Sequence, residues 1–529
     1  MTTRPGFVLE IDRSSPPMLF WKGEGFGLEH LPPSSRVIYP PEPLPPLSNP
    51  RAAIRRALEE PLGDCKPLSA LLKPDMKLTI AFDDISLPLP PMRSPDIRQL
   101  VIETVLEMAA EAGVDDVVLI AALAVHRRMT EAELRHALGS RVYDSFAPYG
   151  LLMQHDACDE DNIVLLGHTE AGEAVEINKR AATSDLLVYV NINLVSMDGG
   201  HKSVATGLSS YRSLRYHHNP ATLANSRSFM DHHHSELHHS NWRMGRLIAK
   251  SGVSVFQIET TLNTNTFPEQ FGFLQRREWE WSVKDRAAYL ATSSLLARTP
   301  LQLRRRLFHS IRSPHALASV QAGEVEAVHE RTIHHIHRQQ LVRVEGQSDV
   351  LAVGLPYISP YNVNSILNPI LVASLGLGYF FNMYKGKPLV RPGGVMIIHH
   401  PTPYEFDIVQ HPSYIDFFEQ VLTETKDPVE MSEKYEEAFA MDPWYTHLYR
   451  TGHAYHGVHP FYMWYWCTHA LEHLGAVIIV GGDKRAVHRM GFKVASTFND
   501  ALEMATDVVG ADPSVTYLHT PPLLLAEVQ

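Results

Sequence analysis

Apolar runs of strand length alternate with segments of helical periodicity along most of this chain. Lys77–Phe82 is β-like, and the apolar residues of Ile97–Ala112 recur at helical spacing up to Gly113. Asp116–Ala124 is then an almost continuous apolar run, as expected of a buried parallel strand. This alternation predicts an α/β fold class with parallel sheets.

The alternation of strand-like and helix-like segments continues beyond these elements. A helix is expected at Glu131–Leu138, because Thr130 and Glu133 form the pattern of a capping box. In the C-terminal part, a helix is expected near Asn364–Leu375. The further predicted strands are Asn162–Leu166, Leu186–Asn193, Ser254–Thr261, Asp349–Gly354, Gly394–His399 and Val477–Gly481.

Shifts in composition divide the chain into four segments. Residues 1–50 are rich in proline, which predicts an extended N-terminal arm. Residues 51–268 are expected to form an N-terminal α/β domain, and residues 345–529 a second one. Between them, residues 269–344 show basic residues and no strand signal up to residue 320, so we expect a helical insertion or linker there.

Overall composition excludes several classes of protein. The 529 residues hold 47 Lys and Arg against 59 Asp and Glu, a net charge of −12, which argues against a nucleic-acid or anionic-membrane partner. Three widely spaced cysteines exclude a disulfide scaffold and fit a reducing compartment. No apolar stretch reaches the ~18–20 residues of a membrane span, and residues 1–30 do not resemble a signal peptide. We therefore expect a cytoplasmic protein.

Histidine is the unusual component of the composition. There are 30 histidines, and seven lie between His217 and His239. Imidazole is the commonest transition-metal ligand and titrates near neutrality, so this content suggests metal or acid–base chemistry. For His232–His239 we favour a solvent-exposed helix start over a second metal site. The histidines between His329 and His337 are interpreted as structural, on an amphipathic helix.

Polar residues follow three of the predicted strands, where parallel α/β domains bind ligands. The first strand ends in Asp83–Pro88, the second in Val125–Arg128, and the third in Asn191-Ile192-Asn193. The loop Gly199-Gly200-His201-Lys202 follows the third strand. Its glycine pair would let backbone N–H groups approach an anion, and Lys202 would add charge, although the spacing is not that of a P-loop.

Taken in this order, these motifs resemble the nickel-pincer lactate racemases and their homologues. Asp84–Pro88 stands where that family has an Asp-x-Thr-Arg-Pro turn, and Ala124–Leu134 where it has Gly-Leu-His-Arg followed by Thr-Glu-x-Glu-Leu. Gly199–Lys202 is similar to the family's Gly-Gly-x-Lys loop, and His218 follows Lys202 by sixteen residues, as in the family. The similarity covers about residues 75–265 and, more loosely, 320–525.

The resemblance implies an isomerase, a racemase or epimerase with its active site in the cleft between two parallel-sheet α/β domains. Its cofactor would be a pyridinium-3-thioamide-5-thiocarboxylic acid mononucleotide that holds nickel. Lys202 corresponds to the cofactor tether, with Gly199 and Gly200 in the cofactor-binding loop. His218 corresponds to the nickel ligand, with His217 as an alternative; soft sulfur plus imidazole suits Ni(II).

The resemblance also assigns the acid–base groups and the partners. His126 corresponds to the catalytic histidine, which accepts the substrate's hydroxyl proton while a hydride leaves the alcohol carbon. Asp84 corresponds to a carboxylate that orients this histidine. The partners implied are a small hydroxy substrate and the enzymes that synthesise the cofactor.

Three departures from the family pattern concern the substrate. The family's carboxylate-binding arginine is replaced by Leu87, which cannot make a bidentate pair with a carboxylate. Its second catalytic histidine is replaced by Ile192, between Asn191 and Asn193, and its C-terminal lysine by Ile370. We therefore expect the substrate to be a 2-hydroxy acid or related hydroxy compound other than lactate, such as a sugar acid or polyol.

Two other functions stay open at the level of sequence. The missing arginine, histidine and lysine favour a catalytically silent homologue that binds a nucleotide-like cofactor or acts by interaction. A metal-dependent hydrolase that uses the histidine clumps is the least favoured, because the chain has no His-Glu-x-x-His spacing.

Overall fold

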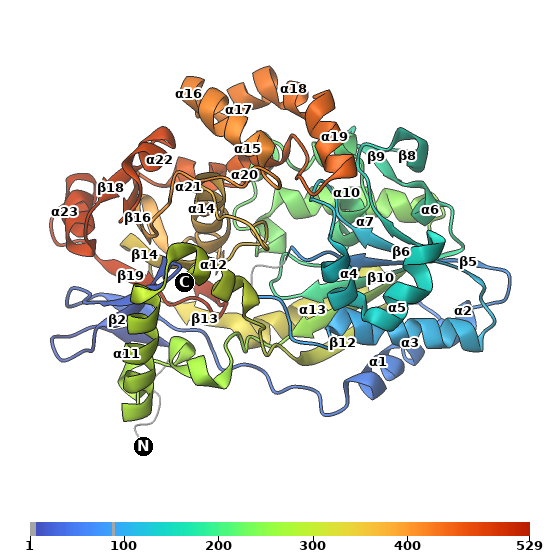
Figure 1. Cartoon of the computed structure of the whole chain (residues 1–529), viewed down its shortest axis with the longest axis horizontal. Helices are drawn as coiled ribbons and strands as arrows, with labels where there is room; N and C mark the ends of the chain where they lie inside the picture. The colour runs from blue at the N-terminus through green and yellow to red at the C-terminus, as the bar shows by residue number, and fades with distance from the viewer. Residues whose placement is uncertain (1–6, 87–89) are drawn as a thin grey trace.

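The computed structural model describes residues 7–86 and 90–529, and two large sheets organise it (Figure 1). The first is six-stranded, in the order β12-β11-β10-β5-β6-β7, and is parallel except for β12, which runs antiparallel to β11. We call this sheet with its helices the N-terminal half. Its strands are β5 (Lys77–Asp83), β6 (Asp116–Ala122), β7 (Leu152–Gln154), β10 (Leu186–Asn193), β11 (Val255–Leu262) and β12 (Leu317–Gly323).

Helices cover both faces of this sheet. One face buries a cluster that includes residues of α3 (Ile97–Glu111), and the other a cluster that includes residues of α7 (Lys202–Gly207) and α10 (Glu236–Lys250). Apolar strand residues alternate between the two clusters, as the pleat requires. The capping box expected at Thr130 and Glu133 is present at the start of α4 (Glu131–Leu138).

The second sheet has nine strands and forms the centre of what we call the C-terminal half. Its main order is β1-β4-β19-β14-β16-β17-β18, and it is parallel from β4 to β18. The strands expected at Asp349, Gly394 and Val477 are all present. Their bounds are β14 (Ser348–Pro356), β16 (Val390–His399), β17 (Ala476–Val480), β18 (Lys493–Ala495) and β19 (Val515–Leu518).

The proline-rich arm pairs with this second sheet, although the two are far apart in sequence. Strand β4 (Arg36–Ile38) pairs with β19 and with β1 (Val8–Glu10), and β2 (Met18–Gly23) pairs with β14 and with β3 (Phe26–Glu29). In Figure 1 these strands lie beside β14 and β19. The two ends of the chain therefore build one half of the molecule together.

Two segments differ in part from what the sequence led us to expect. Residues 269–344 contain α11 (Val283–Arg298), α12 (Leu301–Ser310) and α13 (Val325–Gln340), but also the edge strand β12. Its sequence has a single β-branched residue, Val320, so side-chain preference gave no strand signal. The strand expected at Asn162–Leu166 exists as β8 (Ile163–His168), but it pairs only with β9 (Ala174–Asn178), in a separate hairpin.

The helices of the C-terminal half that matter most here follow β14 and precede β17. They are α14 (Pro369–Ala373), α15 (Pro412–Asp416), α18 (Glu437–Ala440), α19 (Pro443–Thr451), α20 (His459–Tyr465) and α21 (Thr468–His473). Backbone contacts join them to the N-terminal half, since the N–H of His456 donates to the carbonyl of Val125. Within the described residues, no helix is long and apolar enough to cross a membrane.

Candidate active site

His126 and Asp84 meet at the carboxyl ends of two neighbouring parallel strands, β6 and β5. The Nδ1 atom of His126 lies 2.9 Å from Oδ2 of Asp84, and Ser86 donates to the same carboxylate from its backbone N–H and its hydroxyl. Burial alone would raise the pKa of Asp84, but the charge and hydrogen bond of His126 and the bonds from Ser86 lower it overall. The carboxylate is therefore ionised near neutrality and can only accept. Nδ1 of His126 must donate, which leaves Nε2 as the basic nitrogen.

A strained turn places His126. Ala124, two residues earlier, has a φ of +51°, in the left-handed region that favours glycine. Its N–H donates to Gly207, and its carbonyl accepts from the hydroxyl of Tyr449, in α19 of the C-terminal half. Contacts from both halves thus hold this turn and the histidine that follows it.

Lys202 begins α7 directly after the glycine pair. Gly199 and Gly200 have φ values of +93° and +62°, and a Cβ on Gly199 would lie 2.5 Å from Oε1 of Glu259. The N–H of Gly200 donates to the same buried carboxylate, at 2.6 Å. This backbone donor, expected to approach an external anion, is therefore already paired inside the protein. The ammonium of Lys202 donates to the carbonyl of Met197, at 3.4 Å.

His217 and His218 follow α8 (Tyr211–Leu214) and are both buried, with their Nδ1 atoms 2.8 Å apart. Burial lowers the pKa of His218 well below its ordinary value, and the nearby charges of His217, Lys202 and His126 lower it further. A neutral imidazole is the form that binds metals. The structure thus brings together the three side chains that the sequence singled out, namely His126, Lys202 and His218.

One face of α20 lies across the candidate site from His126 and His218. His459, Tyr462 and Trp466 are spaced three and four residues apart, so they share this face. The ring of His459 lies 5.6 Å from that of His126, and Tyr462 and Trp466 lie 5.1 and 6.0 Å from His218. An aromatic run such as Phe461–Trp466 is more often a buried helix face than the lining of a site. All six residues are buried, yet this face also borders the candidate site.

Tyrosines of the C-terminal half complete this wall. The ring of Tyr361 lies 5.2 Å from His126 and 4.8 Å from His459, and its hydroxyl is 3.0 Å from that of Tyr379. The ring of Tyr379 stacks on Trp466. Burial raises the pKa of Tyr361 well above its usual value, so its hydroxyl stays protonated. Our reading of the sequence missed these tyrosines and His459; the only local signal was the helical spacing around Trp466.

Most of the residues that depart from the family pattern are buried or hydrogen-bonded to other parts of the protein. Ile192 is buried in the core, and the side chains of Asn191 and Asn193 donate to Asp83 and to the carbonyl of Asp198. Burial raises the pKa of Asp83 to about 7. Ile370 is fully buried in α14. Leu87 and Pro88 lie outside the described residues.

Of three other basic side chains near the site, two are bound to carboxylates of the protein and one is exposed. Arg127, next to His126, makes a bidentate ion pair with Glu133, with N···O distances of 3.0 and 2.7 Å. His201 is hydrogen-bonded to Glu326, and Arg93 is exposed. Arg93, Arg127 and His201 are the basic side chains of these motifs that could replace the family's arginine, and two of the three are held by carboxylates of the protein itself.

A second histidine group lines a cavity of about 400 Å³ beside Lys202. The Nε2 atoms of His232 and His329 are 3.0 Å apart, the rings of His232 and His238 are 4.0 Å apart, and His329 contacts Glu259. The expectation of a solvent-exposed helix start is therefore wrong for His232 and His238, which are partly buried because His232 contacts His329 of α13 and the ring of His238. His233, His234 and His239 are exposed. In the described parts of the chain, no three His, Cys, Asp or Glu side chains are placed to hold a metal ion.

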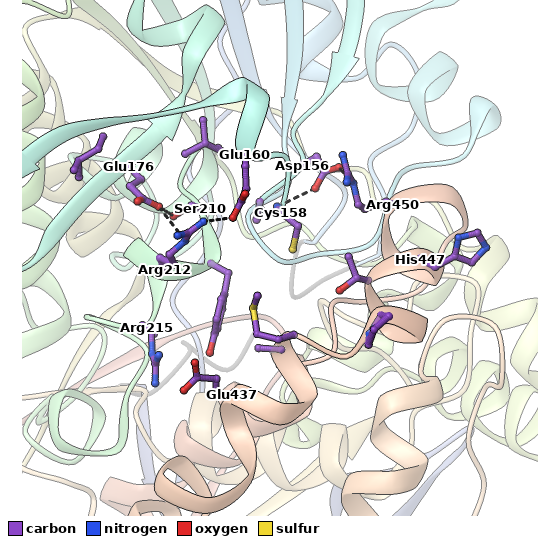
Figure 2. Close-up of a pocket in the computed structure, with 18 of the residues that line it drawn as sticks. Asp156, Cys158, Glu160, Glu176, Ser210, Arg212, Arg215, Glu437, His447 and Arg450 are labelled. Atoms are coloured by element: carbon purple, nitrogen blue, oxygen red, sulfur yellow. Dashed lines mark hydrogen bonds and ion pairs between the residues drawn. The ribbon is translucent and has the colours of Figure 1, made fainter.

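A larger cavity of about 930 Å³ lies between the β8–β9 hairpin and α18–α19 (Figure 2). Its charged side chains pair with one another, as in Arg450 with Asp156 and Arg212 with Glu160. Cys158 lines it, with Sγ 3.0 Å from Nε2 of His456, and burial raises the pKa of this thiol to about 12. The thiol is therefore not an activated nucleophile. His126, Lys202 and His218 are not among the residues that line this cavity.

Comparison with known proteins bears on the N-terminal half first. Residues 25–231 match the family model described as the lactate racemase N-terminal domain. Two lactate racemases align over 169 residues: that of Lactiplantibacillus plantarum is 25% identical, and that of Thermoanaerobacterium thermosaccharolyticum 27%. Each alignment covers 31% of this chain and 37% of the relative, so it spans little more than a third of the relative's length. These matches confirm the resemblance to lactate racemases.

Two solved structures share the fold over nearly the whole chain. The lactate racemase apoprotein from T. thermosaccharolyticum has a TM-score of 0.61 at 16% identity, and covers 96% of this chain and 99% of its own. A protein from Thermotoga maritima has a TM-score of 0.50 at 12% identity, and covers 92% and 99%. At these identities the matches concern the fold alone, and they confirm the α/β fold class with parallel sheets.

Proposed function

We propose that this protein is a racemase or epimerase that inverts a carbinol centre by hydride transfer to a nickel-pincer nucleotide cofactor, and that its substrate is not lactate. The observation that carries the proposal is that buried His218 lies within electrostatic reach of Lys202 and His126, and that His126 and His218 both face α20. The resemblance to lactate racemases supports it at the level of the family.

The residues present fit such a cofactor. Lys202 supplies an amine for the covalent tether. It also borders the cavity of about 400 Å³ described above, which His232, His238 and His329 line and His126 and His218 do not. Burial keeps His218 neutral, and its contact with Nδ1 of His217 fixes the orientation of its ring, as polar neighbours do for metal-binding histidines. When bound, the cofactor would supply the hydride acceptor and three of the nickel donors. The protein would then need to add only one ligand.

The protein's own part in the reaction is the handling of a proton. Asp84 holds His126 through Nδ1, so that Nε2 is free to accept the hydroxyl proton of the substrate. The ionised Asp84 also stabilises the imidazolium that results. General-base catalysis of this kind contributes typically 10²–10⁴-fold to the rate.

The wall opposite His126 bears on substrate choice. It is built from tyrosine, histidine and tryptophan side chains, whose hydroxyls and rings bind polar and apolar parts of a ligand without an ion pair. Arg127 is held by Glu133, and Ile370 replaces the family's lysine. We therefore propose a larger hydroxy compound than lactate, such as a sugar acid or a polyol.

Isotope retention tests the reaction. The protein, coexpressed with cofactor-synthesis enzymes in the presence of nickel, is incubated with 2-hydroxy acids, sugar acids and polyols that bear deuterium on the carbinol carbon. The proposal predicts stereochemical inversion with the deuterium retained in the product, because a hydride does not exchange with water. Inversion with loss of the deuterium to solvent, or no inversion of any of these substrates by protein that contains the cofactor, would contradict it.

A further inference from the structure

His459 has a buried ring nitrogen without a hydrogen-bond partner. The side chain is about 1% exposed, and Nε2 meets no donor or acceptor among residues 7–86 and 90–529. A buried polar atom left unpaired costs about 1–3 kcal/mol, so its retention calls for an explanation. The rings of Tyr455 and Tyr361 lie 4.5 and 4.8 Å from that of His459, and the ring of His126 lies 5.6 Å away. The C-terminal half places His459 beside His126 from the first residue of α20.

The other ring nitrogen of His459 is held in place. Nδ1 lies 2.5 Å from the hydroxyl of Tyr414, in α15. Burial raises the pKa of Tyr414 well above its usual value, so this hydroxyl keeps its proton. A phenol is a stronger donor than a neutral imidazole N–H, and we expect Tyr414 to donate to Nδ1. The proton of His459 is then on Nε2.

His126 and His459 therefore hold opposite tautomers. The carboxylate of Asp84 requires a proton on Nδ1 of His126, which leaves a lone pair on Nε2. Tyr414 requires a lone pair on Nδ1 of His459, which leaves an N–H on Nε2. One imidazole is ready to accept a hydrogen bond and the other to donate one. A hydroxyl group needs this combination if its O–H is to be deprotonated while its oxygen is held.

We propose that His459 is a catalytic residue, whose Nε2–H donates a hydrogen bond to the reacting oxygen of the substrate opposite His126. The inference rests on the proposed function. With the cofactor bound as hydride acceptor, the O–H bond of the substrate would break as the hydride left, and its proton would bind Nε2 of His126. When the hydride returned to the other face, that bond to Nε2 of His126 would break and the same proton would form the new O–H bond. His459 would keep its own proton and hold the oxygen in both steps.

This assignment accounts for Ile192. The N-terminal half has no histidine at the position where the resemblance expected a second one, and Ile192 is part of the core. The C-terminal half supplies an imidazole to the same neighbourhood instead. Tyr361, between His126 and His459 at 5.2 and 4.8 Å, would close one side of the space in which the oxygen is held.

Three variants test the role of His459. His459→Gln replaces the fixed ring N–H with a flexible amide that Tyr414 cannot orient, and Tyr414→Phe removes only the anchor. The matched control is His469→Gln, because His469 makes a similar bond to a buried tyrosine, Tyr384, at 2.7 Å, away from His126. We expect kcat to fall 10²–10³-fold in His459→Gln, about 10-fold in Tyr414→Phe and less than 3-fold in the control. The adduct mass on Lys202 and the nickel content should be unchanged in all three.

A measurement on the cofactor-free protein is independent of turnover. Nitrogen-15 NMR of histidine-labelled protein, with signals assigned by His126→Gln and His459→Gln, reports which ring nitrogen bears each proton. The inference predicts Nδ1–H for His126 and Nε2–H for His459, and a changed His459 signal in Tyr414→Phe. Nδ1–H on His459, or a loaded His459→Gln variant with more than half of the wild-type kcat, would overturn it. Wild-type protein that is loaded yet inactive would instead overturn the proposed function, and this inference with it.

Discussion

Two groups of histidines lie on either side of Lys202, and they differ in what holds them. In the first, which we call the cross-half group, His126, His218 and His459 come from both halves of the molecule, and each has one ring nitrogen bound to a distinct partner. In the second, which we call the α10 group, His232, His238 and His329 come from the N-terminal half and contact one another. The charge of Lys202 lowers the pKa of His218 on one side and of His238 on the other.

The difference shows that crowding is a poor guide to chemistry. The α10 group is the conspicuous one in the sequence, yet His232 and His329 bind each other and His329 binds Glu259, while Nε2 of His238 has no hydrogen-bond partner among the described residues. The cross-half group is assembled from positions more than 300 residues apart, and its members are oriented by Asp84, His217 and Tyr414. Orientation by a neighbouring group that leaves the second nitrogen available is what acid–base and metal-binding histidines need.

The largest effect is expected from the base of the cross-half group. His126→Gln should lower kcat/KM by about 10³-fold, within the range measured for general bases. His239→Gln, an exposed histidine of the α10 region, is the control and should change kcat/KM less than 2-fold. Steady-state kinetics of cofactor-loaded protein measures both. Equal effects of the two substitutions would remove the distinction between the groups.

The carboxylate behind the base should have the next largest effect. We expect Asp84→Asn to lower kcat about 10²-fold, because Nδ1 of His126 loses its charged acceptor. The same variant should lose about 2 kcal/mol of unfolding free energy at pH 7, as expected for a hydrogen bond to a charged group.

The stability loss should depend on pH in a defined direction. The folded protein lowers the pKa of Asp84, so the stabilisation is present above the unfolded-state pKa of about 4 and is lost as pH falls below it. Urea unfolding of wild type and Asp84→Asn at pH 7 and pH 3 measures the difference. A gap that is as wide at pH 3 as at pH 7 would show that Asp84 acts in some other way.

The aromatic face of α20 should affect substrate choice more than rate. Trp466→Ala removes the ring that contacts His218 and stacks on Tyr379. We expect kcat/KM for the best substrate found to fall about 10-fold, with a smaller loss for shorter hydroxy acids. A long substrate would lose its contact with the indole ring, whereas a short one would lose less. Competition between a long and a short substrate reports this directly. A uniform loss for all substrates would indicate a packing defect.

The smallest effect is expected in the α10 group. His238→Gln should change kcat less than 3-fold and leave the nickel content of the loaded protein unchanged. Metal analysis after dialysis, together with kinetics, checks both quantities. A loss of one nickel per chain in His238→Gln would assign the metal to the α10 group and break the comparison.

Local elements of this protein were predictable because their signals lie within a few residues. The apolar run Leu186–Asn193 is strand β10 to the residue, and Thr130 caps α4 as expected. Edge strand β12 was missed because its pairing with β11 depends on backbone hydrogen bonds, whereas its side chains have weak strand preference.

Only some residues of the candidate site could be predicted from the sequence. His126, Lys202 and His218 were found through their order and spacing in a resemblance. His459 was not, because its approach to His126 results from the packing of one half on the other, and no local pattern encodes that packing. The split between partly buried His232 and exposed His233 has the same origin, since His232 contacts His329 of α13.

The most direct test of the central claim is the intact mass and nickel content of the protein after coexpression with cofactor-synthesis enzymes. We predict that the wild-type chain bears a covalent mononucleotide adduct at Lys202 and one nickel ion. Lys202→Ala should bear neither, and His218→Ala should keep the adduct but lose nickel. A wild-type chain without adduct and without nickel, or a Lys202→Ala variant with full activity, would contradict the account.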